Sequence, residues 1–218
     1  MSVIFSLRLF DYDKYIQIFP TLKMIAKNKI TNNDKVKKII EEALHVTTSP
    51  EFSFYNHDFS IVEDWPQLLK GFIQELHSFN KINLTLETAN EYIECIIALL
   101  CMPKFQFYYT SLTTNISENY IALGRFDGRL LGQLQKNTNW FNKIFEWDFP
   151  FDRPDFKYGD AMALFTPTQL MECEKELKAL SNFFSDNEKV RYHYNRLYRL
   201  VTKVTENTST YRIVLCEE

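Results

Sequence analysis

Glycine is scarce in this sequence, with 5 residues in 218, while 16% of the residues are aromatic and 45% are hydrophobic. This is not the composition of a disordered chain or of a glycine-rich repeat array, and it provides enough apolar side chains for a sizeable core. No run approaches the roughly 18 apolar residues of a membrane span. The first residues have neither the basic region nor the cleavage site of a signal peptide, so we expect a cytoplasmic protein without a membrane segment.

Cysteine is also sparse, and no two of the four cysteines form a C-x-x-C pair. Three of them lie in apolar helical patterns, which is typical of reduced, buried thiols rather than of zinc ligands. The histidines show no metal-binding spacing such as H-E-x-x-H, so we expect no metal site. The cysteines are Cys95, Cys101, Cys173 and Cys216.

Familiar catalytic motifs are missing too. The phosphate-cradling patterns G-x-x-x-x-G-K-[ST] and G-x-G-x-x-G do not occur, and neither does the G-x-S-x-G nucleophile elbow. His57 and Asp58 could form an acid/base pair, since a carboxylate orients an imidazole and raises its basicity. Adjacent side chains usually point apart, so we interpret this pair as part of a solvated loop. We expect no cofactor and assign no catalytic residue, but a catalytic site assembled from distant residues stays an alternative.

Hydrophobic periodicity predicts both strands and helices. In the first strand, Leu7 and Leu9 lie on a buried face and Arg8 lies on the other face. Apolar residues spaced by three and four predict the helices. Strands are predicted at 3–9, 104–112, 119–126, 160–165 and 210–218, and helices after residue 11, from 33, at 64–79, at 85–102, from 127, at 168–184 and at 187–204.

The order of these elements predicts an α+β fold rather than regular βαβ winding. We expect a single domain over residues 1–218, with a mixed, mainly antiparallel sheet and at least five helices. The short connection between two of the helices predicts a helical hairpin over residues 64–101. Asp11 or Asp13 should cap the first helix, which we expect Pro20 to end or kink.

The stretch YGDAMALFTPTQL, residues 158–170, is the most motif-like in the chain. Its apolar run predicts a central strand. Thr166 and Gln169, with Pro167 at the first helical position, predict a capping box at the start of the next helix. That helix and the one after it carry apolar stripes along which we expect them to pair. The stripes are Leu170, Cys173, Leu177, Leu180 and Phe184 in the first helix, and Val190, Tyr194, Leu197, Val201 and Val204 in the second.

The pattern Y-G-x-A-x-x-L-x-T-P, followed by a helix with paired leucines, resembles the uncharacterised bacterial YfbM-like group of proteins. The resemblance covers mainly residues 155–216, and the N-terminal strand with its Asp-led helix extends it to the first twenty residues. It implies a small bacterial α+β fold and supplies no catalytic residues. The matching residues are Tyr158, Gly159, Ala161, Leu164, Thr166, Pro167, Leu177 and Leu180.

Residues 145–160, FEWDFPFDRPDFKYGD, interleave acidic and aromatic side chains; we call them the acidic segment. Aromatic rings surrounded by carboxylates suit the capture of a basic protein, because the rings supply contact area and the acids steer the encounter. The plainer interpretation is a loop whose rings are in the core and whose acids are solvated, and a catalytic carboxylate pair is a third. The candidate partner-binding residues are Glu146, Trp147, Asp148, Phe149, Phe151, Asp152 and Asp155.

The predicted helix at 188–204 is basic, although the whole chain has a net charge of −3 and a pI of about 5.9. Such a balance argues against a globally basic nucleic-acid binder but not against a local basic face. Basic and aromatic residues together are what single-stranded nucleic-acid binding uses. A solvated face whose long side chains cover the edge of the core is the common outcome. The residues are Lys189, His193, Arg196, Arg199 and Lys203, with Tyr192 and Tyr198 between them.

The leading hypothesis is therefore a non-enzymatic bacterial binding protein, of an immunity or inhibitor type, that contacts a basic protein through residues 145–160. The alternatives are a nucleic-acid-associated protein that uses helix 188–204 and an enzyme with a dispersed site. No membrane partner is expected, and the sequence assigns no oligomeric state.

Overall fold

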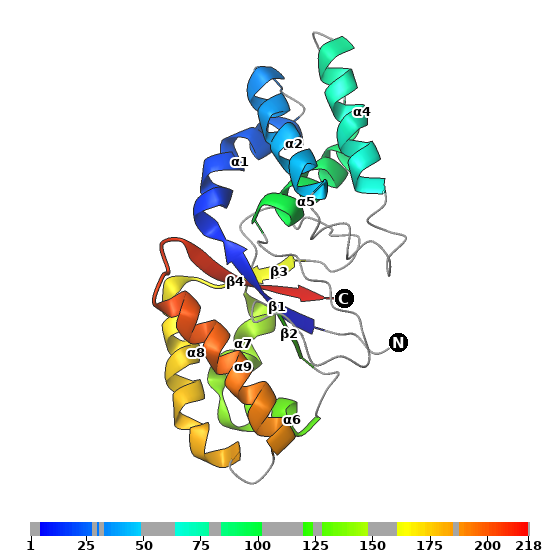
Figure 1. The fold of residues 1–218 in the computed structure, drawn as a ribbon. Coiled ribbons are helices and arrows are strands. Elements are labelled where there is room, and N and C mark those ends of the chain that lie inside the picture. Colours follow the sequence, from blue (N-terminus) through cyan, green and yellow to red (C-terminus); the bar gives the residue numbers. More distant parts are fainter. Residues whose placement is uncertain are drawn as a thin grey trace. The chain divides into compact units, whose positions relative to one another are not determined.

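The computed structural model describes residues 5–27, 30, 33–48, 64–78, 84–101, 120–123, 128–147, 161–184 and 188–217. The chain forms two compact units, of which unit 1 contains residues 1–10 and 116–218 and unit 2 contains residues 11–115. Each unit is described by itself, so a single domain over residues 1–218 stays a prediction. Within the described ranges the chain is mostly helical and has one small sheet, which confirms the α+β class (Figure 1).

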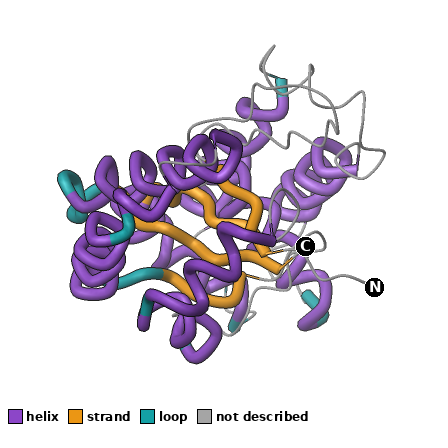
Figure 2. The backbone as a smooth tube through the Cα atoms, turned by 90° about the horizontal axis from the view of Figure 1, so that it is seen from below, coloured by secondary structure: helices purple, strands orange, loops and turns teal. Residues whose placement is uncertain are grey.

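The sheet has four strands, β1 (Phe5–Asp11), β2 (Tyr120–Leu123), β3 (Ala161–Leu164) and β4 (Tyr211–Glu217), in the order β2-β1-β4-β3 (Figures 1 and 2). β1 pairs antiparallel with β2, and Arg8 lies opposite Tyr120. β3 pairs antiparallel with β4. The antiparallel pairing that we predicted is confirmed for these two pairs. The predicted strand at 104–112 lies outside the described residues.

Unit 1 also contains α6 (Gly128–Asn137), α7 (Asn139–Lys143), α8 (Pro167–Ala179) and α9 (Glu188–Thr205), with short 3-10 turns at Ile144–Glu146 and Ser181–Phe184. The predicted capping box is present: the Thr166 hydroxyl accepts from the Gln169 N–H at 3.3 Å, and the Gln169 side chain accepts from the Thr166 N–H at 2.7 Å. Because this box satisfies backbone donors that a helix start leaves without partners, α8 begins where the sequence predicted.

The core of unit 1 lies between one face of the sheet and these helices. Leu7, Leu9 and Ile213 contribute to it from the strands, and Trp140 is fully buried in it. The predicted pairing of α8 with α9 is confirmed, because the Tyr194 hydroxyl donates to the Leu177 carbonyl at 2.7 Å. The residues of both predicted stripes are buried, apart from Phe184, whose side chain is outside the described set.

The face of β1 that carries Arg8 is buried as well, so the expectation that β1 buries only one face is wrong. Arg8, on the face opposite Leu7 and Leu9, is only 8% exposed, and Phe10 beside it is fully buried. Arg212 of β4 is likewise 8% exposed. β1 and β4 are the two inner strands of the sheet. The alternation of apolar and polar residues placed Arg8 on the correct side of β1, but it does not show that this side is buried in the folded chain.

Unit 2 contains α1 (Tyr12–Ala26), α2 (Asn33–Thr47), α4 (Asp64–Ser78) and α5 (Leu86–Cys101). With unit 1, the described residues include eight α-helices, which confirms the expectation of at least five. Asp11 caps α1 by accepting from the Lys14 N–H at 2.8 Å. α5 packs against α1 and α2, and α2 packs against α4.

Two predictions concern the inside of unit 2. Phe72 of α4 stacks on Tyr92 of α5 with ring centroids 3.8 Å apart, so the two helices predicted within 64–101 do contact each other. The expectation that Pro20 could end the first helix is wrong, because α1 continues to Ala26. Proline costs an internal helix about 3 kcal/mol, yet the residues on both sides of Pro20 form one buried face that keeps the helix continuous. These residues are Ile18, Thr21, Leu22 and Ile25.

Residues 49–63 lie outside the described residues, and α2 ends at Thr47. Among the helices described, none combines the length and the apolar character that crossing a membrane requires.

Candidate partner-binding surfaces

The acidic segment begins at the end of the 3-10 turn Ile144–Glu146. Glu146 is exposed and Trp147 is half-buried. The Trp147 N–H donates to the Ile144 carbonyl at 3.4 Å, which closes the turn. The other candidate partner-binding residues lie outside the described part of the chain: Asp148, Phe149, Phe151, Asp152 and Asp155.

Trp147 is held by an aromatic contact that the sequence analysis missed. Its ring meets Phe165 edge-on, with centroids 4.8 Å apart and an interplanar angle of 90°. Phe165 is 1% exposed, and its N–H donates to the Ile213 carbonyl at 2.9 Å. The apolar run of the predicted strand at 160–165 was the available signal that Phe165 is buried.

This contact also joins the chain on either side of residues 148–160. Trp147 immediately precedes these residues and Phe165 follows them by five positions, so the chain is fixed to the core of unit 1 on both sides. Trp147 itself packs against this core but stays partly exposed. An aromatic ring that is anchored and partly accessible has the properties expected of an interface hot spot.

The second surface is the outward side of α9. Arg191, Tyr192, Arg199 and Lys203 are exposed there, and Tyr192 is 48% exposed. The guanidinium carbon of Arg196 lies 5.8 Å from the centroid of the Tyr192 ring. The positions follow from the helix itself, because Val190, Tyr194, Leu197, Val201 and Val204 occupy the buried side.

Most of this surface was predicted from the sequence, but Arg191 was not among the predicted residues. Its spacing of eight residues from Arg199, about two helical turns, was the available signal. His193 and Tyr198 are only half-buried, and Lys189 has no described side chain. The basic helix is therefore largely the solvated face that its pattern predicted, with one exposed ring among its cations.

Three of the four cysteines are core residues. Cys95, Cys101 and Cys173 are free and fully buried, as predicted, while the side chain of Cys216 is outside the described set. Burial raises the pKa of all three thiols, and nearby carboxylates raise it further, so each thiol stays protonated near neutral pH. Neutral, inaccessible thiols are poor nucleophiles.

Two further candidate chemical sites are the His57–Asp58 pair and a metal site. His57 and Asp58 lie outside the described residues. Within the described ranges, no three His, Cys, Asp or Glu side chains gather as metal ligands would.

The resemblance to the YfbM-like group stays a prediction. No protein-family model, curated protein or solved structure matches this chain.

Proposed function

We propose that this chain is a non-enzymatic binding protein that captures a basic protein partner through the acidic segment, residues 145–160. The observation that carries the proposal is Trp147, whose ring is fixed edge-on against Phe165 and remains partly exposed. A ring already held in place loses little side-chain entropy when a partner covers it.

The charge of the segment supports a basic partner. Residues 145–160 contain five carboxylates and two cations, Arg153 and Lys157, which gives a net charge of 2 − 5 = −3. Glu146, the first of the carboxylates, is exposed beside Trp147. In this arrangement the aromatic residues supply most of the affinity, and the acids accelerate association and select against acidic partners.

A basic amphipathic peptide of lysine and leucine is a suitable probe, because it offers both cations and apolar contacts. We expect Trp147→Ala to weaken its binding by about 30-fold, the equivalent of a 2 kcal/mol hot spot. Neutralising Asp148 and Asp152 with asparagine should mainly slow association. Surface plasmon resonance measures both the affinity and the association rate.

Trp65→Ala is the matched control, since Trp65 is also half-buried but lies in α4 of unit 2. It should leave the affinity for the peptide unchanged. Equal losses in the Trp147 and Trp65 variants would refute the proposal, as would an affinity that none of the changes in residues 145–160 alters.

The bacterial origin and the immunity or inhibitor role rest on the sequence resemblance and on the acidic segment, and a cytoplasmic location rests on sequence alone. Among the described side chains, no arrangement supports a catalytic site assembled from distant residues.

A further inference from the structure

We propose that the outward face of α9 binds single-stranded nucleic acid. The site is a row of four side chains, Tyr192, Arg196, Arg199 and Lys203, which we call the basic stripe. Their spacings of four, three and four residues place them along one side of the helix. With a rise of 1.5 Å per residue, the row is about 16 Å long.

Positive charge is concentrated on this helix. Residues 188–205 contain five Lys or Arg residues and one carboxylate, Glu188, so their net charge is 5 − 1 = +4. The whole chain has a net charge of −3, so the remaining residues sum to −3 − 4 = −7. A local field of the opposite sign to the rest of the molecule favours a polyanion at this face over other parts of the surface.

The charge at the centre of the stripe is directed to solvent. Arg199 is exposed, and no carboxylate among the described residues forms an ion pair with it. A phosphate that contacts Arg199 therefore has no carboxylate of the described residues to displace.

The exposed ring of Tyr192 is a feature that a merely solvated basic helix does not require. Its side chain is 48% exposed, which places it among the few large hydrophobic residues that the described surface exposes. The Arg196 guanidinium lies over the ring at 5.8 Å and orients it by a cation-π contact. The ring can stack with an unpaired base while the three cations of the stripe, Arg196, Arg199 and Lys203, contact phosphates.

The stripe is also held rigidly. The opposite side of α9 is buried, and the Tyr194 hydroxyl ties the helix to the Leu177 carbonyl of α8. The four side chains are thus presented by a fixed backbone, which lowers the entropy cost of binding. A base in a duplex is not accessible for stacking, so this arrangement favours single strands.

Fluorescence anisotropy with labelled oligouridine tests the proposal. For three phosphates neutralised on a single strand, the affinity should fall with salt with a logarithmic slope of about −2, or about 18-fold between 50 and 200 mM. Replacing Arg199 and Lys203 by glutamine should reduce the slope to about −0.7, because one contact is left. Tyr192→Ala should weaken binding by about 5-fold or more, and Tyr192→Phe should restore it, because phenylalanine keeps the stacking surface.

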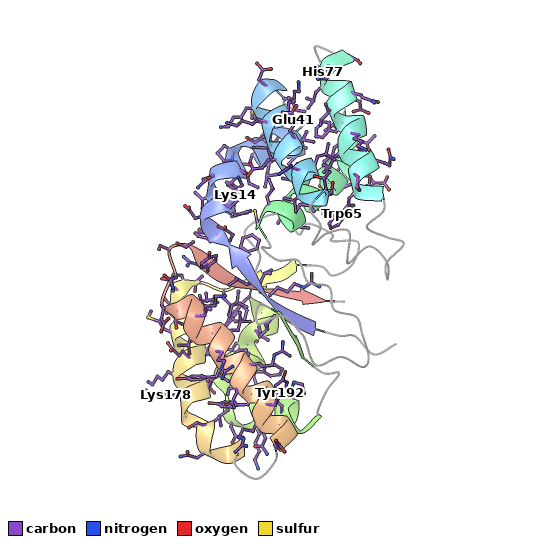
Figure 3. All side chains as sticks on the ribbon, in the orientation of Figure 1. Lys14, Glu41, Trp65, His77, Lys178 and Tyr192 are labelled. Carbon is purple, nitrogen blue, oxygen red and sulfur yellow. The ribbon has the colours of Figure 1, made fainter. Side chains whose placement is uncertain are left out.

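The matched control removes two lysines from α8 of the same unit. Lys175 and Lys178 are exposed, and Lys178 projects from α8 while Tyr192 lies on α9 (Figure 3). The variant with glutamine at both positions has the same net charge as the stripe variant, and we expect it to bind oligouridine like the unchanged protein. Melting temperatures confirm that each variant is folded.

Three results would overturn the proposal. The first is no binding at 50 mM salt, and the second is an equal loss of affinity in the α8 control, which would mean that only net charge matters. The third is self-association that depends on both the basic stripe and the acidic segment and that oligouridine does not inhibit. In that case the face binds a second copy of the chain instead of nucleic acid.

Discussion

Tyr194→Phe tests the hydrogen bond that ties α9 to α8. Tyr194 is 3% exposed, and its hydroxyl donates to the Leu177 carbonyl at 2.7 Å. Phenylalanine keeps the ring and its packing, so the substitution removes the hydroxyl alone. The change in the free energy of unfolding therefore reports the loss of the hydroxyl, whose described hydrogen bond is the one to Leu177.

The expected cost follows from what the carbonyl retains. The Leu177 oxygen also accepts from the Leu180 N–H at 2.9 Å, so it is not left without a donor when the hydroxyl is removed. A hydrogen bond lost in this way costs about 1 kcal/mol net, at the low end of the 1–3 kcal/mol of a buried group with no remaining partner. Tyr194→Ala also removes the ring from the core and should cost about 3–5 kcal/mol.

Urea unfolding followed by tryptophan fluorescence measures these changes. Trp140 and Trp147 belong to unit 1, as Tyr194 does, while Trp65 belongs to unit 2. A Trp65→Phe background therefore makes the emission report unit 1 alone. Tyr198→Phe is the control, because this ring is half-buried on the same helix, and it should change stability by less than about 0.5 kcal/mol.

Two outcomes contradict this account. If Tyr194→Phe costs no more than Tyr198→Phe, the bond to Leu177 contributes nothing to stability. If it costs more than about 3 kcal/mol, the Leu177 carbonyl has been left unsatisfied, and the Leu180 N–H is not the partner that the structure shows.

Two further predictions concern stability. Because the Gln169 side chain accepts from the Thr166 N–H at 2.7 Å and the reciprocal bond is 3.3 Å long, Gln169→Ala should cost at least as much as Thr166→Ala, each about 1 kcal/mol by thermal unfolding. A smaller cost for Gln169→Ala would contradict this reading of the cap. Burial raises the pKa of Tyr92 and Tyr194 to about 12, from an ordinary value of 10.0. Between pH 10 and pH 12 the unfolded chain has released protons that the folded chain retains, so the free energy of unfolding falls as pH rises. Tyr194→Phe should make this fall smaller, as measured by urea unfolding at several pH values over that interval.

Local chemistry explains which parts of the fold were predictable from sequence. The capping box and the paired stripes of α8 and α9 depend on residues three or four apart, and the structure has them at the predicted positions. The hydrogen bond from Tyr194 to Leu177 was not predicted, although both residues were in the predicted stripes. Periodicity gives the face of a helix, but it does not give the partner of a hydroxyl on that face.

Contacts between distant residues account for what the sequence could not show. β1 and β4 are neighbours in the sheet although about 200 residues separate them, and unit 2 lies between β1 and the rest of unit 1 in sequence. Arg8 of β1 is only 8% exposed, which the pattern of a single strand does not show. At Pro20 a local rule failed because packing on both sides of the proline outweighed it.

The candidate surfaces were predictable in composition but not in geometry. The charges and rings of residues 145–160 and 188–204 are visible in the sequence. The edge-on contact of Trp147 with Phe165 and the exposure of Tyr192 required the folded chain. Phe165 lies eighteen residues after Trp147, which is outside the reach of any helix or strand pattern.

The ionisable groups with raised pKa values help to locate where function lies on the described chain. Tyr15, Tyr92 and Tyr194 are shifted first by burial, and so are the three buried cysteines. A catalytic acid or base is usually set by burial together with a specific charged partner at an accessible place, so that its pKa lies near the working pH. Shifts that carry tyrosines and thiols further from neutrality keep them uncharged in the core near neutral pH. Among the described residues, the features that suit a function are thus the exposed ones: the ring of Trp147 beside Glu146, and the ring of Tyr192 among the cations of α9.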